Sequence, residues 1–238
     1  MRFFPIVGIG LLLLLLLSSC DDGRIYGDEV VVDREGGSAT VTGHIEGLES
    51  WASGYSIVFA GFSEDSEYAK TAKGISAGAD GSMRVSLSGI PVEVTRLEIC
   101  AINRLRRRVA TFYSTSFTSG ADTVRLEAGE VDASMFGAIQ AEVFDRSCTA
   151  CHGGSTEAAG GLFLTEGHSY DALVNVEADL SPEGLMLVEP GVAEASFLHQ
   201  VLREDVVRYD HTQIITSSML LDLVDNWINN GAIEYYKI

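Results

Sequence analysis

Residues 38–45 read Ser-Ala-Thr-Val-Thr-Gly-His-Ile, a stretch in which apolar and polar side chains alternate. Val41 and Ile45 fall on one side of this alternation, whereas Thr42 and His44 fall on the other. A period of two is typical of a β-strand that buries one of its faces. The stretch therefore predicts a half-buried strand, with His44 on the exposed face.

Similar short segments continue to about residue 130. They are rich in β-branched and aromatic residues, and turn-forming pairs such as Asp80-Gly81 separate them. Short strands at this spacing are typical of an antiparallel β-sandwich. We therefore expect a sandwich domain over residues 30–130. Its further strands are expected at 55–62, 83–87, 96–103, 108–113 and 123–126.

The pattern becomes helical from residue 131 onward. Two segments place apolar residues three or four positions apart, as on one face of an α-helix. Asp132 or Ser134 is a candidate cap for the first helix, and Gly231 is suited to end the second. We expect an all-α domain over 131–238, and hence a two-domain fold. The apolar positions are Phe136, Ile139, Val143 and Phe144, then Leu220, Leu223, Val224, Trp227 and Ile228.

The first of these helices leads into Cys148-Thr-Ala-Cys151-His152. This spacing is the attachment signature of a c-type haem. Each thiol can form a thioether with a haem vinyl group, and the adjacent histidine can give a ring nitrogen to the iron. The sequence therefore predicts one covalent haem c on Cys148 and Cys151, with His152 as an iron ligand.

Zinc binding and thiol redox chemistry also use a Cys-x-x-Cys pair. Adjacent Cys151 and His152 would make a poor zinc chelate, and the chain has no second Cys-x-x-Cys pair to complete four ligands. Haem is therefore the favoured interpretation, and zinc is the alternative.

The N-terminus is typical of a targeting segment. Arg2 precedes an apolar stretch at 3–17 that is too short for a comfortable membrane span. The run 17–20, Leu-Ser-Ser-Cys, resembles a bacterial lipobox, which implies cleavage before Cys20 and lipidation of its thiol. We expect a lipoprotein signal peptide at 1–19 and a linker at 20–29. An ordinary secretory signal or an uncleaved anchor are the alternatives.

These features predict a lipid-anchored protein of the cell envelope, on the periplasmic or the cell-surface side of what we expect to be the outer membrane. The formal net charge is −18 at pH 7. Such a surface repels nucleic acid, so nucleic-acid binding is not expected, and it can steer a basic redox partner.

Four pieces of the C-terminal half carry a family resemblance. The pieces are VFDRSCTACHGG (143–154), GGLFL with SYDALVN (160–164, 169–175), LVEPG with SFL (187–191, 196–198) and DNWINNGA (225–232). With the pieces in this order and at roughly this spacing, the segment resembles a class I-like monohaem cytochrome c domain found in planctomycetes and Bacteroidota. The resemblance implies a cytochrome c fold, covalent haem c, His152 as the proximal ligand, and electron transfer.

One departure from the family concerns the second iron ligand. The family usually carries an Arg-Met-Pro-Pro-like stretch whose methionine looks like that ligand, but residues 208–213 here read Arg-Tyr-Asp-His-Thr-Gln. His211 lies at about the same place, and imidazole is a common haem ligand. We therefore predict His211 as the second ligand. Met219 is the next candidate, and an iron without a second protein ligand is the remaining alternative. Met186, His168 and His199 are not expected to bind the iron.

The leading hypothesis is thus a membrane-anchored electron carrier rather than an enzyme, and no catalytic residue is predicted. Its redox partner is unidentified. One alternative is a five-coordinate haem enzyme or sensor that reacts with peroxide or binds a small gas. The other is a surface lipoprotein whose β domain binds a polymer or a partner protein.

Overall fold

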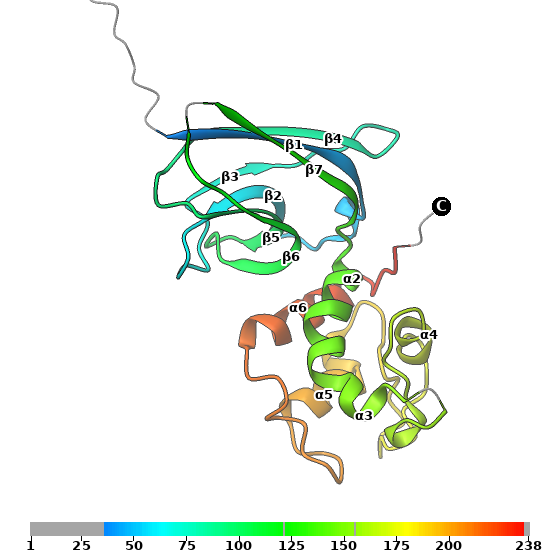
Figure 1. Cartoon of the computed structure of the whole chain (residues 1–238). Coiled ribbons are helices and arrows are strands. Elements are labelled where there is room, and N and C mark those ends of the chain that lie inside the picture. The colour runs from blue at the N-terminus through cyan, green and yellow to red at the C-terminus, as the bar shows by residue number, and fades with distance from the viewer. Residues whose placement is uncertain (1–35, 121, 155, 236–238) are drawn as a thin grey trace, which may run out of the picture. The chain divides into compact units, whose positions relative to one another are not determined.

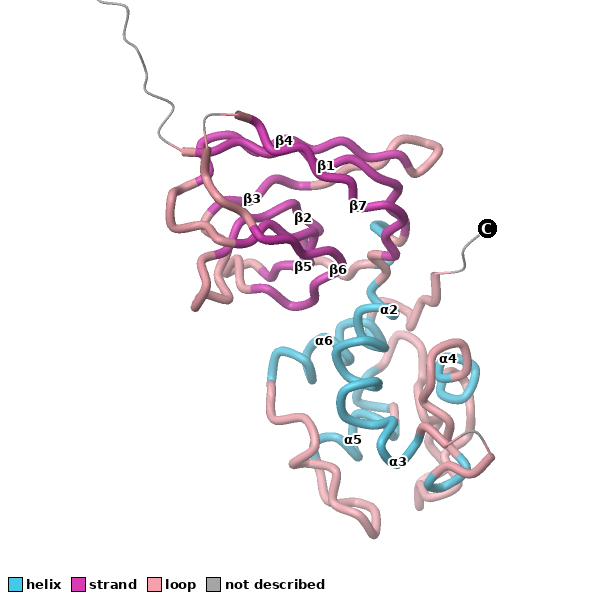
Figure 2. Tube along the Cα trace, viewed as in Figure 1, coloured by secondary structure: helices cyan, strands magenta, loops and turns pink. Residues whose placement is uncertain are grey.

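A computed structural model describes residues 36–120, 122–154 and 156–235 (Figure 1). The expected signal peptide (1–19), the lipidation of Cys20 and the linker (20–29) lie outside the described residues. Within the described part, strands come first and short helices follow (Figure 2). None of the helices in that part is long and apolar enough to cross a membrane.

The strands form two sheets. The four-stranded sheet has the order β3-β2-β5-β6 and is antiparallel throughout. The three-stranded sheet has the order β4-β1-β7. The strands are β1 (Gly37–Glu46), β2 (Tyr55–Phe62), β3 (Thr71–Gly74), β4 (Ser82–Ile90), β5 (Arg96–Asn103), β6 (Arg108–Ser116) and β7 (Thr123–Asp132).

The smaller sheet is mixed. β1 pairs antiparallel with β4 but parallel with β7, in a register that joins Val41 to Leu126 and Ile45 to Val131. Parallel neighbours need a long connection, and here all the intervening strands supply it. The expectation of a purely antiparallel sandwich is therefore wrong for β7, which pairs in parallel with β1.

Apolar side chains of the two sheets meet in a buried core. Val41 and Ile45 of β1 and Phe59 of β2 are almost completely buried. The same cluster continues without a break into the helical region, where it includes Phe144 and Trp227. A smaller cluster on the four-stranded sheet holds Val58, Ala60, Phe62, Ala69, Cys100 and Ile102.

The C-terminal region contains short helices joined by long irregular segments. A helical run of three parts comes first, in which the middle part, η2, is π-helical. The elements are α2 (Met135–Ile139), η2 (Gln140–Cys148), α3 (Thr149–His152), α4 (Ser169–Leu173), α5 (Phe197–Arg203) and α6 (Ser218–Asn229), with 3-10 turns at η1 (Leu48–Ser50), η3 (Ala159–Gly161) and η4 (Ala193–Ala195).

The predicted fold class is therefore wrong, because this region is not an all-α cytochrome c-like domain. The two helices predicted from periodicity lie at its two ends, and the helices between them, α4 and α5, are short. Between α4 and α5, isolated bridges join Val174 to Val188 and Met186 to both Glu177 and Ser196, and hold the chain in non-helical conformations. Glycine-rich and proline-containing stretches at 153–191 favour turns over helix.

The end of β7 is joined firmly to the start of the helical run. Ser134, one of the two predicted candidates, caps α2, because its hydroxyl accepts a hydrogen bond from Gly137 N at 3.0 Å. Met135 N donates to Ser50 Oγ at 2.8 Å, and that hydroxyl donates to Gly47 O at 2.7 Å. These bonds satisfy backbone groups at the helix start that would otherwise lack partners.

Candidate functional site

The Cys-x-x-Cys-His motif lies at the end of the helical run Met135–His152, across the end of η2 and α3 (Figure 1). π-helical geometry is rare and is often found at functional sites. Cys148 is half-buried, Cys151 is exposed and His152 is half-buried. The structure thus brings the three predicted attachment residues together at an accessible helix end.

The two motif thiols have different surroundings. Burial raises the pKa of Cys148 to about 11, and the nearby Cys151 adds to this effect. The Cys148 thiol points toward Val143 O at 3.8 Å. Both thiols, and that of Cys100, are free of disulfides. The motif therefore presents one accessible and one half-buried thiol to a bound group.

The ring of His152 is oriented by the chain that follows the motif. Its Nδ1 lies 3.2 Å from Leu162 O, and Leu164 N donates to His152 O at 2.8 Å. A carbonyl oxygen can only accept, so Nδ1 carries the proton in this contact. The lone pair is then on Nε2, where an imidazole commonly binds a metal.

His211 faces His152. The two ring centroids are 6.4 Å apart and the ring planes differ by 31°. Imidazole nitrogens bind metals at about 2 Å. The two rings are therefore near enough for both histidines to reach one bound metal atom.

A second observation at His211 points the same way. Its Nδ1 is buried and has no hydrogen-bond partner. Buried polar atoms are nearly always paired, so an exception calls for a ligand, an ion or a water at the site. Tyr209 packs edge-on against the ring, with centroids 5.2 Å apart.

His211 belongs to the loop 204–217 between α5 and α6, which is orange in Figure 1. Ile214 N donates to His211 O at 3.0 Å, and Thr212 N donates to Asp210 Oδ1 at 2.8 Å. Ile215 is buried in the main core. These contacts fix the part of the loop that carries the ring.

The other candidate ligands have contacts of their own. Met219 packs against the main core, and Met186 joins two isolated bridges. His168 is exposed and contacts Glu166 O and Thr165. His199 Nδ1 lies 2.8 Å from Asp225 Oδ1. Of the residues considered from the sequence, His211 is the one whose ring packs against His152.

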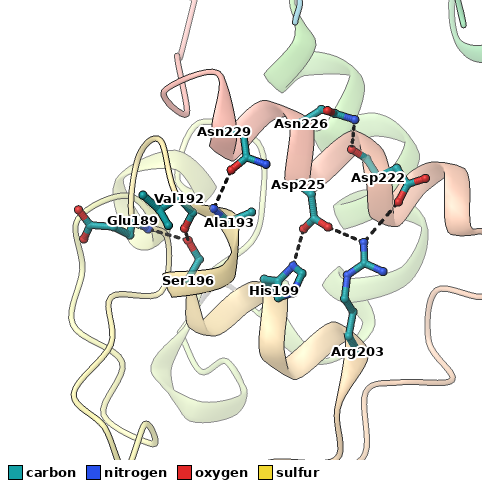
Figure 3. A network of polar contacts seen from close by, with 10 residues as sticks. All are labelled: Glu189, Val192, Ala193, Ser196, His199, Arg203, Asp222, Asp225, Asn226 and Asn229. Atoms are coloured by element: carbon teal, nitrogen blue, oxygen red, sulfur yellow. Dashed lines mark hydrogen bonds and ion pairs between the residues drawn. The ribbon is translucent and has the colours of Figure 1, made fainter. Parts of the chain in front are cut away.

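Sequence reasoning missed a polar network on α5 and α6 (Figure 3). Asp225 accepts from His199 and also pairs with Arg203, which extends to Asp222 at 3.4 Å. On the same face of α6, Asn229 Oδ1 accepts from Ala193 N at 2.9 Å. These partners come from separate helices, so no spacing within one segment reveals them.

The donor set suits a haem better than a bare ion. In the described residues, no group of three or more His, Cys, Asp or Glu side chains is placed to hold a metal ion. Structural zinc sites need four such ligands. A haem needs only one or two iron ligands from the protein, because its macrocycle supplies the other donors. His152 and His211 would meet that need, and Cys148 and Cys151 would suit covalent attachment.

Comparison with known proteins assigns no family. No protein-family model matches the chain, and no curated protein is similar enough to count as a relative. The resemblance to monohaem cytochromes c stays a prediction from the four sequence pieces.

Proposed function

We propose that the protein is an electron carrier of the cell envelope that holds one haem c covalently. The opposed rings of His152 and His211, 6.4 Å apart, are the observation that carries the proposal. A bound haem iron supplies a one-electron couple. In this proposal Cys148 and Cys151 would hold the haem through thioether bonds, and His152 and His211 would be the iron ligands.

The chain's own residues would set the conditions for that couple. The contact of His152 with Leu162 O fixes the tautomer and orientation of the ring, as is common for metal-bound histidines. The buried side of His211 excludes water from one of its nitrogens.

The proposed position in the cell follows from the leader. Lipidation of Cys20 would tether the protein to a membrane, which we expect to be the outer membrane. The acidic surface, with a net charge of −18, would favour a redox partner with a basic docking face. Electron carriers rely on such steering because their encounters are brief.

Of the alternatives, a five-coordinate haem enzyme or sensor requires an open iron position. The packing of His211 beside His152 favours a second protein ligand, so this alternative has weaker support. No specific contact in the described residues favours a binding role for the β domain over the electron carrier.

The first experiment tests covalent attachment. Residues 25–238 are expressed in a host that matures c-type cytochromes, and the pyridine haemochrome spectrum is taken after denaturation. We expect a haem c spectrum from the wild type and from Cys100→Ser, and loss of covalent haem in the Cys148→Ser/Cys151→Ser double variant. A wild-type protein without covalent haem would overturn the proposal.

The second experiment tests axial ligation. We expect the ferric protein to be low-spin and His211→Ala to become high-spin, with low spin restored by added imidazole. His168→Ala is the matched control, because His168 is an exposed histidine in the same region. A low-spin His211→Ala protein without imidazole would remove His211 from the ligand set.

A further inference from the structure

The position of the loop that carries His211 depends on the elements at its ends as well as on its local contacts at 210–215. Residues 204–217 contain no helix or strand. A segment of this length without regular structure has many conformations, and holding it in one of them costs conformational entropy. A ligand on such a loop must still be placed to within about 0.5 Å of its required position.

The start of the loop is tied to the middle of α6 by the polar network of Figure 3. Arg203 is the last residue of α5, immediately before the loop, and it forms an ion pair with Asp225 of α6. His199, one turn earlier on α5, contacts the other oxygen of the same carboxylate at 2.8 Å. One side chain of α6 therefore holds two side chains of α5.

The four side chains of this network differ in their exposure to solvent. The side chain of Asp225 is 19% exposed, those of His199 and Arg203 are 21% and 31% exposed, and that of Asp222 is 62% exposed. Partly buried charge pairs are less weakened by solvent than exposed ones. The carboxylate of Asp225 is thus the centre of the network, and Asp222 is peripheral.

We propose that Asp225 is a positioning residue for His211. By joining His199 and Arg203 to the middle of α6, it fixes the end of α5, from which the loop starts, and so helps to hold the ring of His211 opposite His152. The inference rests on the proposed function, because it concerns the second axial ligand of the proposed haem. Asp225 itself touches neither ring in this arrangement and acts through the loop.

The test uses ferric holoprotein and measures the rate at which potassium cyanide binds. Cyanide replaces a protein ligand only when that ligand leaves, so the rate reports how firmly His211 is held. We expect Asp225→Asn to bind cyanide about tenfold faster than the wild type, because loss of a supporting contact commonly weakens a metal ligand by that factor or more. Asp222→Asn, the matched control, should stay within about twofold.

A second variant keeps the test valid if Asp225→Asn does not fold. Arg203→Gln removes the ion pair but leaves the His199–Asp225 contact, and it should also accelerate cyanide binding. If Asp225→Asn fails to retain haem or to show the wild-type circular dichroism spectrum, the proposal is judged from the cyanide-binding rate of Arg203→Gln alone. Hydrogen exchange of the 204–217 amides in the ferric protein gives an independent readout, and it should be faster in both variants.

The outcomes separate the two proposals. Covalent haem and a low-spin wild type, combined with unchanged cyanide rates and unchanged exchange in both variants, would overturn the role of Asp225 alone. Absence of covalent haem from the wild type would overturn the proposed function and this inference together. Acceleration in Asp225→Asn and Arg203→Gln but not in Asp222→Asn would support the positioning role.

Discussion

The ring of His211 packs against that of His152 at 6.4 Å between centroids, although the two residues belong to separate parts of the chain. His152 ends α3, and His211 lies in the loop between α5 and α6. A contact between two half-buried imidazoles gains little by itself, and one of their nitrogens is buried without a partner. The proposed ligation of a haem by both histidines rests on this pair.

The identity of the second ligand predicts a change in reduction potential. Methionine–histidine ligation raises the potential of haem iron, so the proposed pair of histidines should give a lower value. We expect a wild-type midpoint potential below zero and a higher potential for His211→Met, measured by potentiometric titration. A wild-type potential well above zero would contradict ligation by His211.

The cysteines should react in a fixed order in protein made without haem. The thiolate is the reactive form, and burial raises the pKa of Cys148 to about 11. At pH 8 we expect iodoacetamide to modify exposed Cys151 first, Cys148 more slowly and buried Cys100 last, as followed by mass spectrometry. The rate at Cys148 should rise as the pH approaches 11. Equal rates at Cys148 and Cys151 would contradict this environment.

The buried carboxylate Glu98 should contribute strongly to stability. Its side chain is 2% exposed and it accepts from Arg108 at 2.7 Å and from Thr111 at 3.2 Å. Hydrogen bonds to charged groups contribute more than neutral ones, so Glu98→Gln should lower the free energy of unfolding by about 2 kcal/mol. Urea denaturation measures this change.

The control for Glu98 is Glu67, which pairs with Arg107 at 2.8 Å but is 57% exposed. An exposed pair contributes little, so Glu67→Gln should cost less than about 1 kcal/mol. Similar losses of unfolding free energy in Glu98→Gln and Glu67→Gln would show that burial does not increase the contribution of the Glu98–Arg108 pair.

The start of the helical run should be sensitive to substitution at Gly47. Its φ is +81°, and a Cβ there would lie 2.5 Å from Ser134 N. Gly47→Ala should therefore lower the free energy of unfolding by about 3 kcal/mol, through backbone strain and the clash. Gly129 has a φ of +69° and open space around it, so Gly129→Ala should cost about 1 kcal/mol. Equal costs would rule out the close approach to Ser134.

Local patterns predicted the positions of most strands. The expected segments 55–62 and 96–103 coincide with β2 and β5, because β-branched and aromatic residues gather there. β3, Thr71–Gly74, was not predicted, since four residues carry too little periodicity. The parallel pairing of β1 with β7 was also missed, because alternation reports which face is buried and not the direction of the neighbouring strand.

The residues of the candidate site were likewise predictable from the sequence only in part. Cys148, Cys151 and His152 are adjacent in the sequence, so a short motif was enough to find them. His211 was proposed from its place relative to a family pattern, and its proximity to His152 is visible only in the structure. The link from Asp225 to His199 and Arg203 joins two helices, and a single sequence contains no signal for it.

The parallel pairing of β1 and β7 has a mechanical consequence. The pairs run from Ser38 with Thr123 to Glu46 with Asp132, so the beginning of β1 and the end of β7 lie at opposite ends of one ladder. A chain tethered before β1 and pulled beyond β7 would load these hydrogen bonds in shear. They would have to break together, instead of one after another as in an opening zipper. A pulling force between a tether and a docked partner would therefore act along β1 and β7, the direction in which the sheet resists rupture most.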